Sequence, residues 1–369
     1  MLGKSVRMKF EPPSGAPSSG IGLPRKTVPA GYDRAASSLA LQPLLQQFNV
    51  DLFQVLAESG LPPETFAHPD NLVPFRHGSR LLGLCAERTG CAHLGLLIGR
   101  HTPMESLGFV ADLVKAAPHV HSALVLLARY LKFSDGGGLL ALHEDSRFAS
   151  CSYVLYEPGV EHADIVYDIV LGTLWNVLRS LCGDSWLPHE VQLMRRRPVD
   201  IRPYRSFFRA PLRFDCEQSS VVFDRKWLDI PLQSADPQRL NALVAQADAA
   251  EAQSTFELAT HVRQIVRRQL LTGTASMDCV AAELAMNRRT LDRHLKRNGL
   301  SFKSLSDQLR YEIARHILST TAMPVGDVAQ SLRYANAGAF STAFRRWSGH
   351  TPTQWRSAAS AMADTQIDA

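Results

Sequence analysis

The chain lacks the features by which several classes of protein are recognised from sequence. Its six cysteines form no CxxC pair and no regular framework, so the sequence predicts reduced cysteines rather than disulfides or a common zinc site. No apolar run approaches the roughly 20 residues that cross a bilayer. No secretory signal core follows Met1. We therefore expect a cytoplasmic protein without a membrane segment, a metal ion or a cofactor.

Catalytic motifs are also missing. The sequence contains no GxSxG, P-loop or HExxH spacing, which argues against common hydrolases, nucleotide-binding enzymes and zinc proteases. Asp164 and Asp168 are four residues apart, as paired carboxylates on one helix face would be. Acidic residues in the first turns of a helix are usually explained by the helix dipole. The sequence thus indicates a protein that is not an enzyme.

Positive charge is concentrated in the last third of the chain. Residues 257–358 carry 15 Lys and Arg against 7 Asp and Glu, whereas the other residues carry 25 against 28. A basic module on a slightly acidic body predicts a polyanion partner for that module alone. With 369 residues, of which 45 % are apolar, the chain is long enough for two domains with buried cores.

Helical and strand patterns alternate in the first two thirds, which predicts a mixed α+β domain over residues 35–235. Residues 1–34 are rich in Pro, Gly and Ser and are expected to form a disordered tail. Residues 236–256 are rich in Ala, Gln and Asp, and we interpret them as a linker that begins as a helix at Asp236-Pro237. Residues 359–369 form a second tail. Before Pro198, the run Arg195 to Arg197 is expected to be solvated, with recognition of a carboxylate as the alternative.

Residues 257–358 contain one pattern twice. VAAELAMNRRTLDRHLKRNGLSF starts at Val280 and VAQSLRYANAGAFSTAFRRWSGHTP at Val328. Each copy predicts a short helix, a tight turn and a second helix with a basic end, with Asn287 and Asn336 as N-caps of the second helices. The segment between them predicts a helix of some four turns with Leu305, Leu309, Ile313 and Ile317 on one face. The pattern therefore predicts an all-α domain with two helix-turn-helix motifs joined by a long helix. The second helix of each motif is expected to enter a major groove of DNA.

These motifs resemble the AraC/XylS family of bacterial transcription regulators. The resemblance lies in RTLDRHLKRNGLSF, LRYEIARHIL and VAQSLRY…AFSTAFRRWSGHTPTQWR, and it covers roughly residues 257–358. The preceding domain resembles the family's arabinose-binding-type N-terminal region, chiefly through YRSFFRAPLRFDCEQSSVVFDRKWLDIPLQSADP. Such regulators of amino-acid catabolism use this region for effector sensing and dimerisation.

The resemblance implies a sequence-specific regulator that binds double-stranded promoter DNA. It implies a homodimer that acts beside RNA polymerase on the bacterial nucleoid, most often as an activator. The effector is expected to be an amino acid or another organic acid, and no pocket residue is assigned to it. The alternative is an enzyme-like or partner-sensing domain fused to a DNA-binding module.

In the first helix-turn-helix, the outward positions of the second helix predict base contacts. Arg289 and Arg293 are four residues apart, so both can reach base edges, and Arg forms bidentate bonds with guanine. The family's base-reading positions, transferred to this sequence, fall on Arg289, Asp292 and Arg293. Four further polar residues of this helix are interpreted as contacts to the DNA backbone, with solvated charge as the alternative: Arg288, Thr290, Lys296 and Arg297.

The second helix-turn-helix departs from its family. Relatives carry an F-x-R-x-F pattern, whereas Thr342 replaces its Arg here and offers at most a short base contact. Relatives also have Gly at the position of Arg333, where a left-handed backbone would cost Arg about 1–2 kcal/mol. Because phosphate contacts position and base contacts specify, we predict that the first motif reads sequence and the second holds the backbone. The backbone contacts assigned to the second motif are Asn336, Ser341, Arg345, Arg346 and Arg356.

Overall fold

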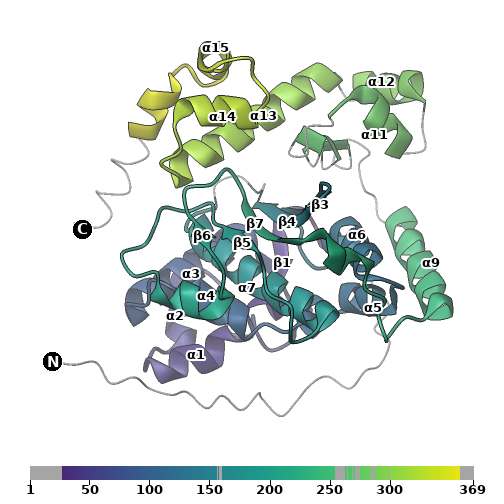
Figure 1. The fold of residues 1–369 in the computed structure, drawn as a ribbon. Coiled ribbons are helices and arrows are strands. Elements are labelled where there is room, and N and C mark those ends of the chain that lie inside the picture. The colour runs from purple at the N-terminus through teal and green to yellow at the C-terminus, as the bar shows by residue number, and fades with distance from the viewer. Residues whose placement is uncertain are drawn as a thin grey trace.

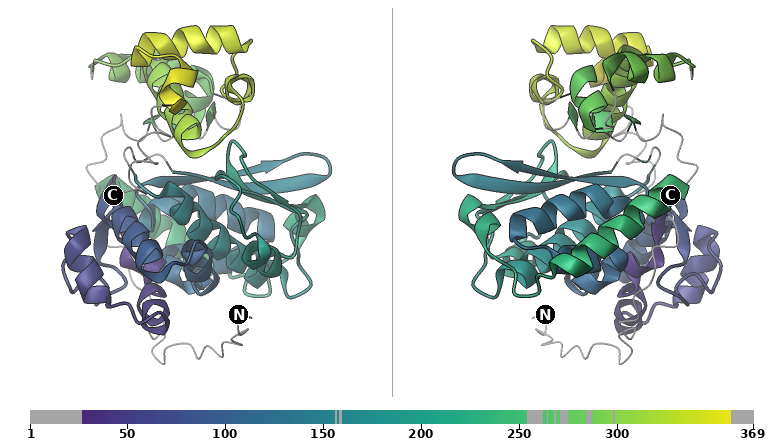
Figure 2. Two further views of the ribbon diagram at one scale, coloured as in Figure 1. Left: turned by 90° about the vertical axis from the view of Figure 1, so that its left-hand side faces the viewer. Right: turned by 90° about the vertical axis from the view of Figure 1, so that its right-hand side faces the viewer.

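The computed structural model describes residues 27–155, 157, 160–253, 262–263, 265–267, 269–270, 275–283, 287–297 and 299–357. In this part of the chain, a mixed domain of helices and strands is followed by a helical domain (Figure 1). The helices of the first domain lie on one side of its sheet, and the second domain lies on the other side (Figure 2). The predicted fold class is confirmed.

A five-stranded sheet organises the first domain. Its strand order is β3-β4-β7-β5-β6. All neighbours pair antiparallel except β5 and β6. Cys151, Val191 and Val221 meet in register across three strands and are fully buried, so the centre of the sheet belongs to the core. The strands are β3 (Gly138–Glu144), β4 (Phe148–Leu155), β5 (Glu190–Gln192), β6 (Leu212–Arg213) and β7 (Ser219–Asp224).

Helices cover this sheet and extend the domain away from it. The α-helices are α1 (Leu41–Gln47), α2 (Leu52–Ser59), α3 (Phe75–Thr89), α4 (Leu94–Arg100), α5 (Phe109–Ala116), α6 (Val120–Tyr130), α7 (Ala163–Cys182) and α8 (Arg202–Phe208). The short 3-10 helices are η1 (Ala35–Ser38), η2 (Met104–Leu107), η3 (Leu131–Phe133) and η4 (Arg225–Asp229). By length and hydropathy α7 could span a membrane, so the expectation of no such apolar run is wrong for this segment. Two thirds of α7 is buried inside the protein, as in the core helix of a soluble domain.

Helices α4 and α7 pack unusually close together because glycines line their contact. A Cβ atom on Gly95 would lie 2.4 Å from the carbonyl oxygen of Ile165, and one on Gly99 would lie 2.4 Å from that of Ile169. Gly172 approaches Gly99 from the opposite helix, at 3.0 Å from its hypothetical Cβ. The absence of side chains at these positions sets the distance between the two helices.

The first domain begins earlier than the composition suggested. Strand β1 (Tyr32–Arg34) pairs antiparallel with β2 (Leu72–Pro74), and the amide of Val28 donates to the carbonyl of Lys132 at 2.9 Å. The expected tail boundary at residue 34 is therefore wrong for residues 27–34. The Pro- and Gly-rich composition of this segment could not predict that it pairs with a strand about 40 residues further along the chain. Residues 1–26 and 358–369 lie outside the described residues.

The linker region forms helix α9 (Pro237–Gln253), which starts where Asp236-Pro237 predicted. Leu243 and Ala247 are buried, and Arg239 donates to Asp112 of α5 at 2.8 Å. This helix therefore packs along the first domain (Figure 1), which the composition did not predict.

The second domain confirms the repeated pattern. Helix α13 joins the two motifs, and all four of its predicted apolar residues are buried: Leu305, Leu309, Ile313 and Ile317. The helices are α11 (Met277–Glu283), α12 (Arg288–Arg297), α13 (Phe302–Thr320), α14 (Val325–Ser331) and α15 (Ala337–Ser348). Leu284, which the repeat also included, lies outside the described residues.

The turn before α15 stores backbone strain at Arg333. Its φ of 61° lies in the left-handed region, as the comparison with Gly in relatives suggested. Gly adopts this conformation without a steric penalty.

We therefore expect Arg333→Gly to be more stable than Arg333→Ala by about 1 kcal/mol in denaturant unfolding. The Ala variant is the matched control, because it removes the same charged side chain and keeps Cβ. Equal stabilities of the two variants would mean that this turn is not strained.

Candidate DNA-binding interface

The first helix-turn-helix brings the predicted base-reading residues together. Helix α12 follows Asn287, whose side-chain oxygen accepts a hydrogen bond from the amide of Thr290 at 2.8 Å. Leu291 and Leu295 are buried and hold α12 against the domain. The outward face of the helix is an open hollow lined by Arg289, Asp292, Arg293 and Lys296.

The charges on α12 are not equally available. Asp292 pairs with Lys296 at 2.7 Å, and Arg288 pairs with Asp278 at 3.1 Å. Arg289 and Arg293 are exposed. Within the part of the chain that the structure describes, no ion pair involves either guanidinium. With no partner among the described residues, these two Arg side chains can bind a polyanion. The side chain of Arg297 lies outside the described residues.

The second helix-turn-helix has a different outward face. Phe340 and Phe344 are fully buried. The side chain of Asn336 accepts from the amide of Ala339 at 2.8 Å, so Asn336 is the predicted N-cap. The hydroxyl of Thr342 donates to the carbonyl of Gly338 at 3.0 Å, back within its own helix. The middle of this face therefore offers only short side chains.

Basic residues flank that neutral stretch. Arg345 and Arg346 are exposed at the C-terminal end of α15, and Arg346 donates to Asp307 of α13 at 3.2 Å. Arg356 is different, because its guanidinium donates to the carbonyl of Met323 and is partly buried. Its side chain binds the segment that connects α13 and α14. This arrangement does not support a phosphate contact by Arg356.

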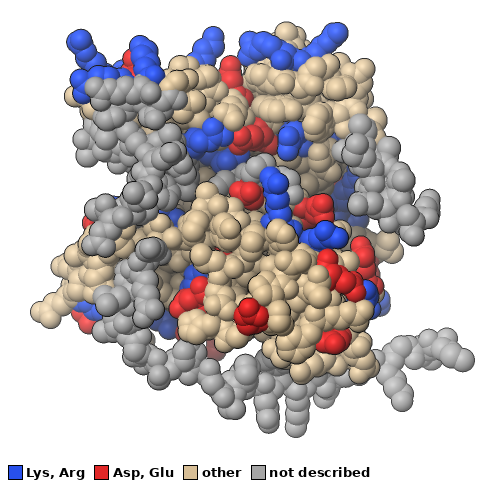
Figure 3. Space-filling view, turned by 180° about the vertical axis from the view of Figure 1, so that it is seen from behind, with Lys and Arg blue, Asp and Glu red and all other residues tan. Residues whose placement is uncertain are grey.

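The basic side chains gather on one edge of the molecule. Figure 3 shows Lys and Arg side chains along the outer edge of the second domain, away from the first domain. The first domain shows acidic and basic side chains intermixed. This distribution agrees with the charge imbalance in the sequence and leaves α12 and α15 accessible on the same side of the molecule (Figure 1).

The two domains touch through a partly buried hydrogen bond. The hydroxyl of Tyr167 on α7 lies 2.8 Å from Nε2 of His316 on α13. Burial, together with the nearby Arg267 and Arg315, lowers the pKa of His316 to about 4. A second contact joins the amide of Ala322 to the carboxylate of Asp215 at 3.0 Å. These partners are more than 100 residues apart, and no sequence pattern pointed to them.

The acidic pair on α7 has a structural partner. Arg195 binds Asp168, and it approaches Asp164 at 3.1 Å. The hydroxyl of Tyr204 completes the group around Asp168. Arg195 is only 9 % exposed, so the expectation of a solvated run is wrong for this residue. Asp164 and Asp168 are therefore both paired with Arg195 of the same chain. The helix dipole alone does not explain the two carboxylates at these positions.

Comparisons with known proteins agree with this architecture. The family model described as the arabinose-binding domain of AraC transcription regulators matches residues 50–232, and a helix-turn-helix domain model matches residues 280–358. The HTH-type transcriptional regulator VirS of Mycobacterium tuberculosis is 24 % identical over 88 % of this chain and 96 % of its own length. The ornithine utilization regulator of Pseudomonas aeruginosa is 23 % identical over 90 % of this chain and 96 % of its own length.

A solved structure is also similar. The transcriptional regulator CdpR from Pseudomonas aeruginosa is 22 % identical, with a TM-score of 0.42, over 83 % of this chain and 96 % of its own. These domains and relatives are those of transcription regulators and not of enzymes. The chain belongs to the AraC family of transcription regulators, with an arabinose-binding-type ligand domain followed by a DNA-binding domain of two helix-turn-helix motifs.

Proposed function

We propose that the two motifs divide the work of binding promoter DNA. Arg289, Asp292 and Arg293 of α12 contact base edges, while Arg345 and Arg346 of α15 contact phosphates. The observation that carries this proposal is the open face of α12, where two Arg guanidinium groups without ion pairs among the described residues lie beside Asp292. Thr342 contributes at most one short base contact because its hydroxyl already bonds to Gly338.

The remaining assigned residues have supporting parts in this proposal. Arg288, Thr290 and Lys296 lie at or beside the same face and supply backbone contacts. In the second motif, Ser341 and the cap residue Asn336 lie near the start of α15, where helix amides favour a phosphate. Arg297 and Arg356 stay in the proposal as expectations from the sequence alone.

We further infer that an effector in the first domain controls this DNA-binding domain. The connection runs through aromatic side chains: Tyr153 packs edge-on against Tyr167 at 6.1 Å between ring centroids, and Tyr167 bonds to His316 of α13. Helix α13 holds both motifs, so a shift of Tyr167 is transmitted to both.

The chain acts as a homodimer beside RNA polymerase in the bacterial cytoplasm, as an activator. The relative named for ornithine utilization favours an amino acid or related acid as effector.

The division between the motifs predicts two distinct defects. Arg293→Ala should weaken binding to a selected high-affinity site by about 1–3 kcal/mol and relax base preference at one position. Arg345→Ala should weaken binding about equally on all sequences and reduce the slope of log K against log salt by about 1. The measurement is fluorescence anisotropy with selected and scrambled duplexes at several salt concentrations.

The matched control for charge is Lys226→Ala, because Lys226 is an exposed cation of the first domain, paired with Asp224. This variant should bind both duplexes like the unaltered chain. A change of base preference in Arg345→Ala, with none in Arg293→Ala, would show that the roles of the two motifs are reversed.

A further inference from the structure

A small cavity lies inside the first domain. Its volume is about 130 Å³. Its walls are mostly apolar, with Leu81, Leu127, Leu140, Val166 and Ile169 among them. An apolar protein cavity of about 150 Å³ is large enough to bind benzene. The cavity therefore suits a ligand whose body has about the size of a six-membered ring.

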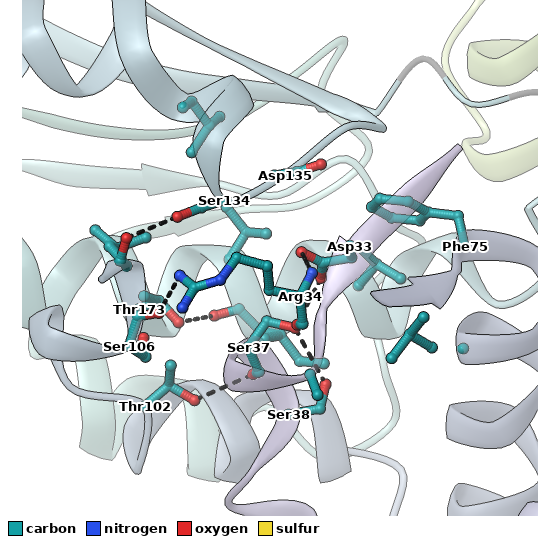
Figure 4. Close-up of a pocket in the computed structure, with 18 of the residues that line it drawn as sticks. Asp33, Arg34, Ser37, Ser38, Phe75, Thr102, Ser106, Ser134, Asp135 and Thr173 are labelled. Atoms are coloured by element: carbon teal, nitrogen blue, oxygen red, sulfur yellow. Dashed lines mark hydrogen bonds between the residues drawn. The ribbon is translucent and has the colours of Figure 1, made fainter. Parts of the chain in front are cut away.

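One end of this cavity carries two carboxylates. Asp33 and Asp135 are partners in an isolated antiparallel bridge, and both line the cavity (Figure 4). Asp33 accepts hydrogen bonds from the amide of Arg34 and the hydroxyl of Ser37, each at 2.7 Å. Asp135 accepts from the hydroxyl of Tyr153 at 2.6 Å, and also from two backbone amides. These bonds fix both carboxylates in place.

Neither carboxylate forms an ion pair with a residue that the structure describes. The guanidinium of Arg34, which also lines the cavity, binds Asp70 and donates to the carbonyl of Ser106 at 3.3 Å. Burial and the neighbouring carboxylate of Asp135 raise the pKa of Asp33 to about 8. Arg34 and Ser37 oppose this rise only in part. Two adjacent carboxylates without a cation create a site that a positive charge would stabilise.

We propose that this cavity binds a small organic cation, with an ammonium group between Asp33 and Asp135 and a short apolar body against the leucine-rich walls. This inference rests on the proposed effector control and narrows its ligand class: a small amine with an apolar body fits, whereas an organic acid without an amine does not. The position of Tyr153 links the site to the DNA-binding domain, because its hydroxyl bonds to Asp135 and its ring packs on Tyr167.

Three probes of similar shape test the ligand class with the full chain. Cyclohexylamine, cyclohexanol and cyclohexanecarboxylate are titrated by calorimetry at pH 8. We expect the amine to bind at least 10-fold more tightly than the alcohol and the carboxylate to show no binding. Equal or tighter binding of the alcohol or the carboxylate would overturn the cation assignment, as would failure of all three probes to bind.

The pH dependence supplies a second readout that needs no variant. An amine with a pKa near that of lysine, about 10.4, stays charged below pH 9. Asp33 is faced by Asp135, Arg34, Ser37 and Tyr153, and it holds a proton below its raised pKa of about 8. The cation must displace that proton, so affinity for the amine should fall from pH 8 to pH 6 with proton release on binding. A flat profile without proton release would contradict the proposal.

Variants then place the site. Asp33→Asn keeps the side-chain size and should remove the preference for the amine over the alcohol. Asp112→Asn, which alters a carboxylate paired with Arg239 elsewhere in the same domain, should keep that preference. Unchanged amine binding in Asp33→Asn would exclude this cavity as the site.

Failure of the cation proposal is distinguishable from failure of effector control. If the amine binds with the expected pH dependence but leaves the affinity for promoter DNA unchanged, the cavity is a cation site and the proposed control is wrong. If the alcohol or the carboxylate binds best and alters DNA affinity, the control stands and the ligand class is wrong.

Discussion

Asp168→Ala is expected to lower the free energy of unfolding by about 3–5 kcal/mol, because it leaves the guanidinium of Arg195 buried without its main partner. The side chain of Asp168 is 1 % exposed and that of Arg195 is 11 % exposed, so water cannot replace the lost carboxylate. Tyr204 would also lose the acceptor of its hydroxyl. Chemical denaturation followed by circular dichroism measures this loss.

Two further variants separate burial from charge. Asp164→Ala removes a carboxylate from the same helix and the same Arg195, but the side chain of Asp164 is 39 % exposed. Its cost should stay below about 1 kcal/mol, as for other exposed ion pairs. Replacing both partners, as Asp168→Leu with Arg195→Met, should recover much of the stability lost in Asp168→Ala. A loss below 1 kcal/mol in Asp168→Ala would show that this ion pair is not buried in solution.

Gly99→Ala is expected to lower the free energy of unfolding by about 3 kcal/mol. The new Cβ atom would meet the carbonyl oxygen of Ile169 at 2.4 Å, and that atom belongs to the backbone of α7. A flexible side chain could turn away, but here the two helices must separate, which disturbs packing along their length. Thermal and denaturant unfolding of the full chain measure the loss.

The matched control is Gly326→Ala in α14, where a Cβ atom meets nothing within 4 Å. Ala is the better helix former by up to about 1 kcal/mol, so this variant should keep or gain stability. If the two substitutions had the same effect, close helix packing would not be the reason for glycine at position 99.

In the second domain, the order of the helices and the faces that they bury were predictable from the sequence. The N-caps Asn287 and Asn336 are local patterns, and so are the buried residues spaced four apart on α12 and α15 (Leu291 and Leu295, Phe340 and Phe344). Local patterns of this kind fix helix ends and helix faces. The proposed reading residues of α12 share one face for the same reason. Arg356 was less predictable, because its bond to Met323 depends on how residues 352–357 fold back on the domain.

In the first domain, the sequence by itself determined the presence of helices and strands. Only the tertiary structure decided which distant residues meet: Asp33 with Asp135, Arg195 with Asp168, and Tyr167 with His316. These partners are separated by 27 to 149 residues, and periodicity reports only the face on which a residue lies. Burial and the pairing of charges depend on packing between elements, so the cavity of the first domain and the contacts from Tyr153 through Tyr167 to His316 became visible only in the folded chain.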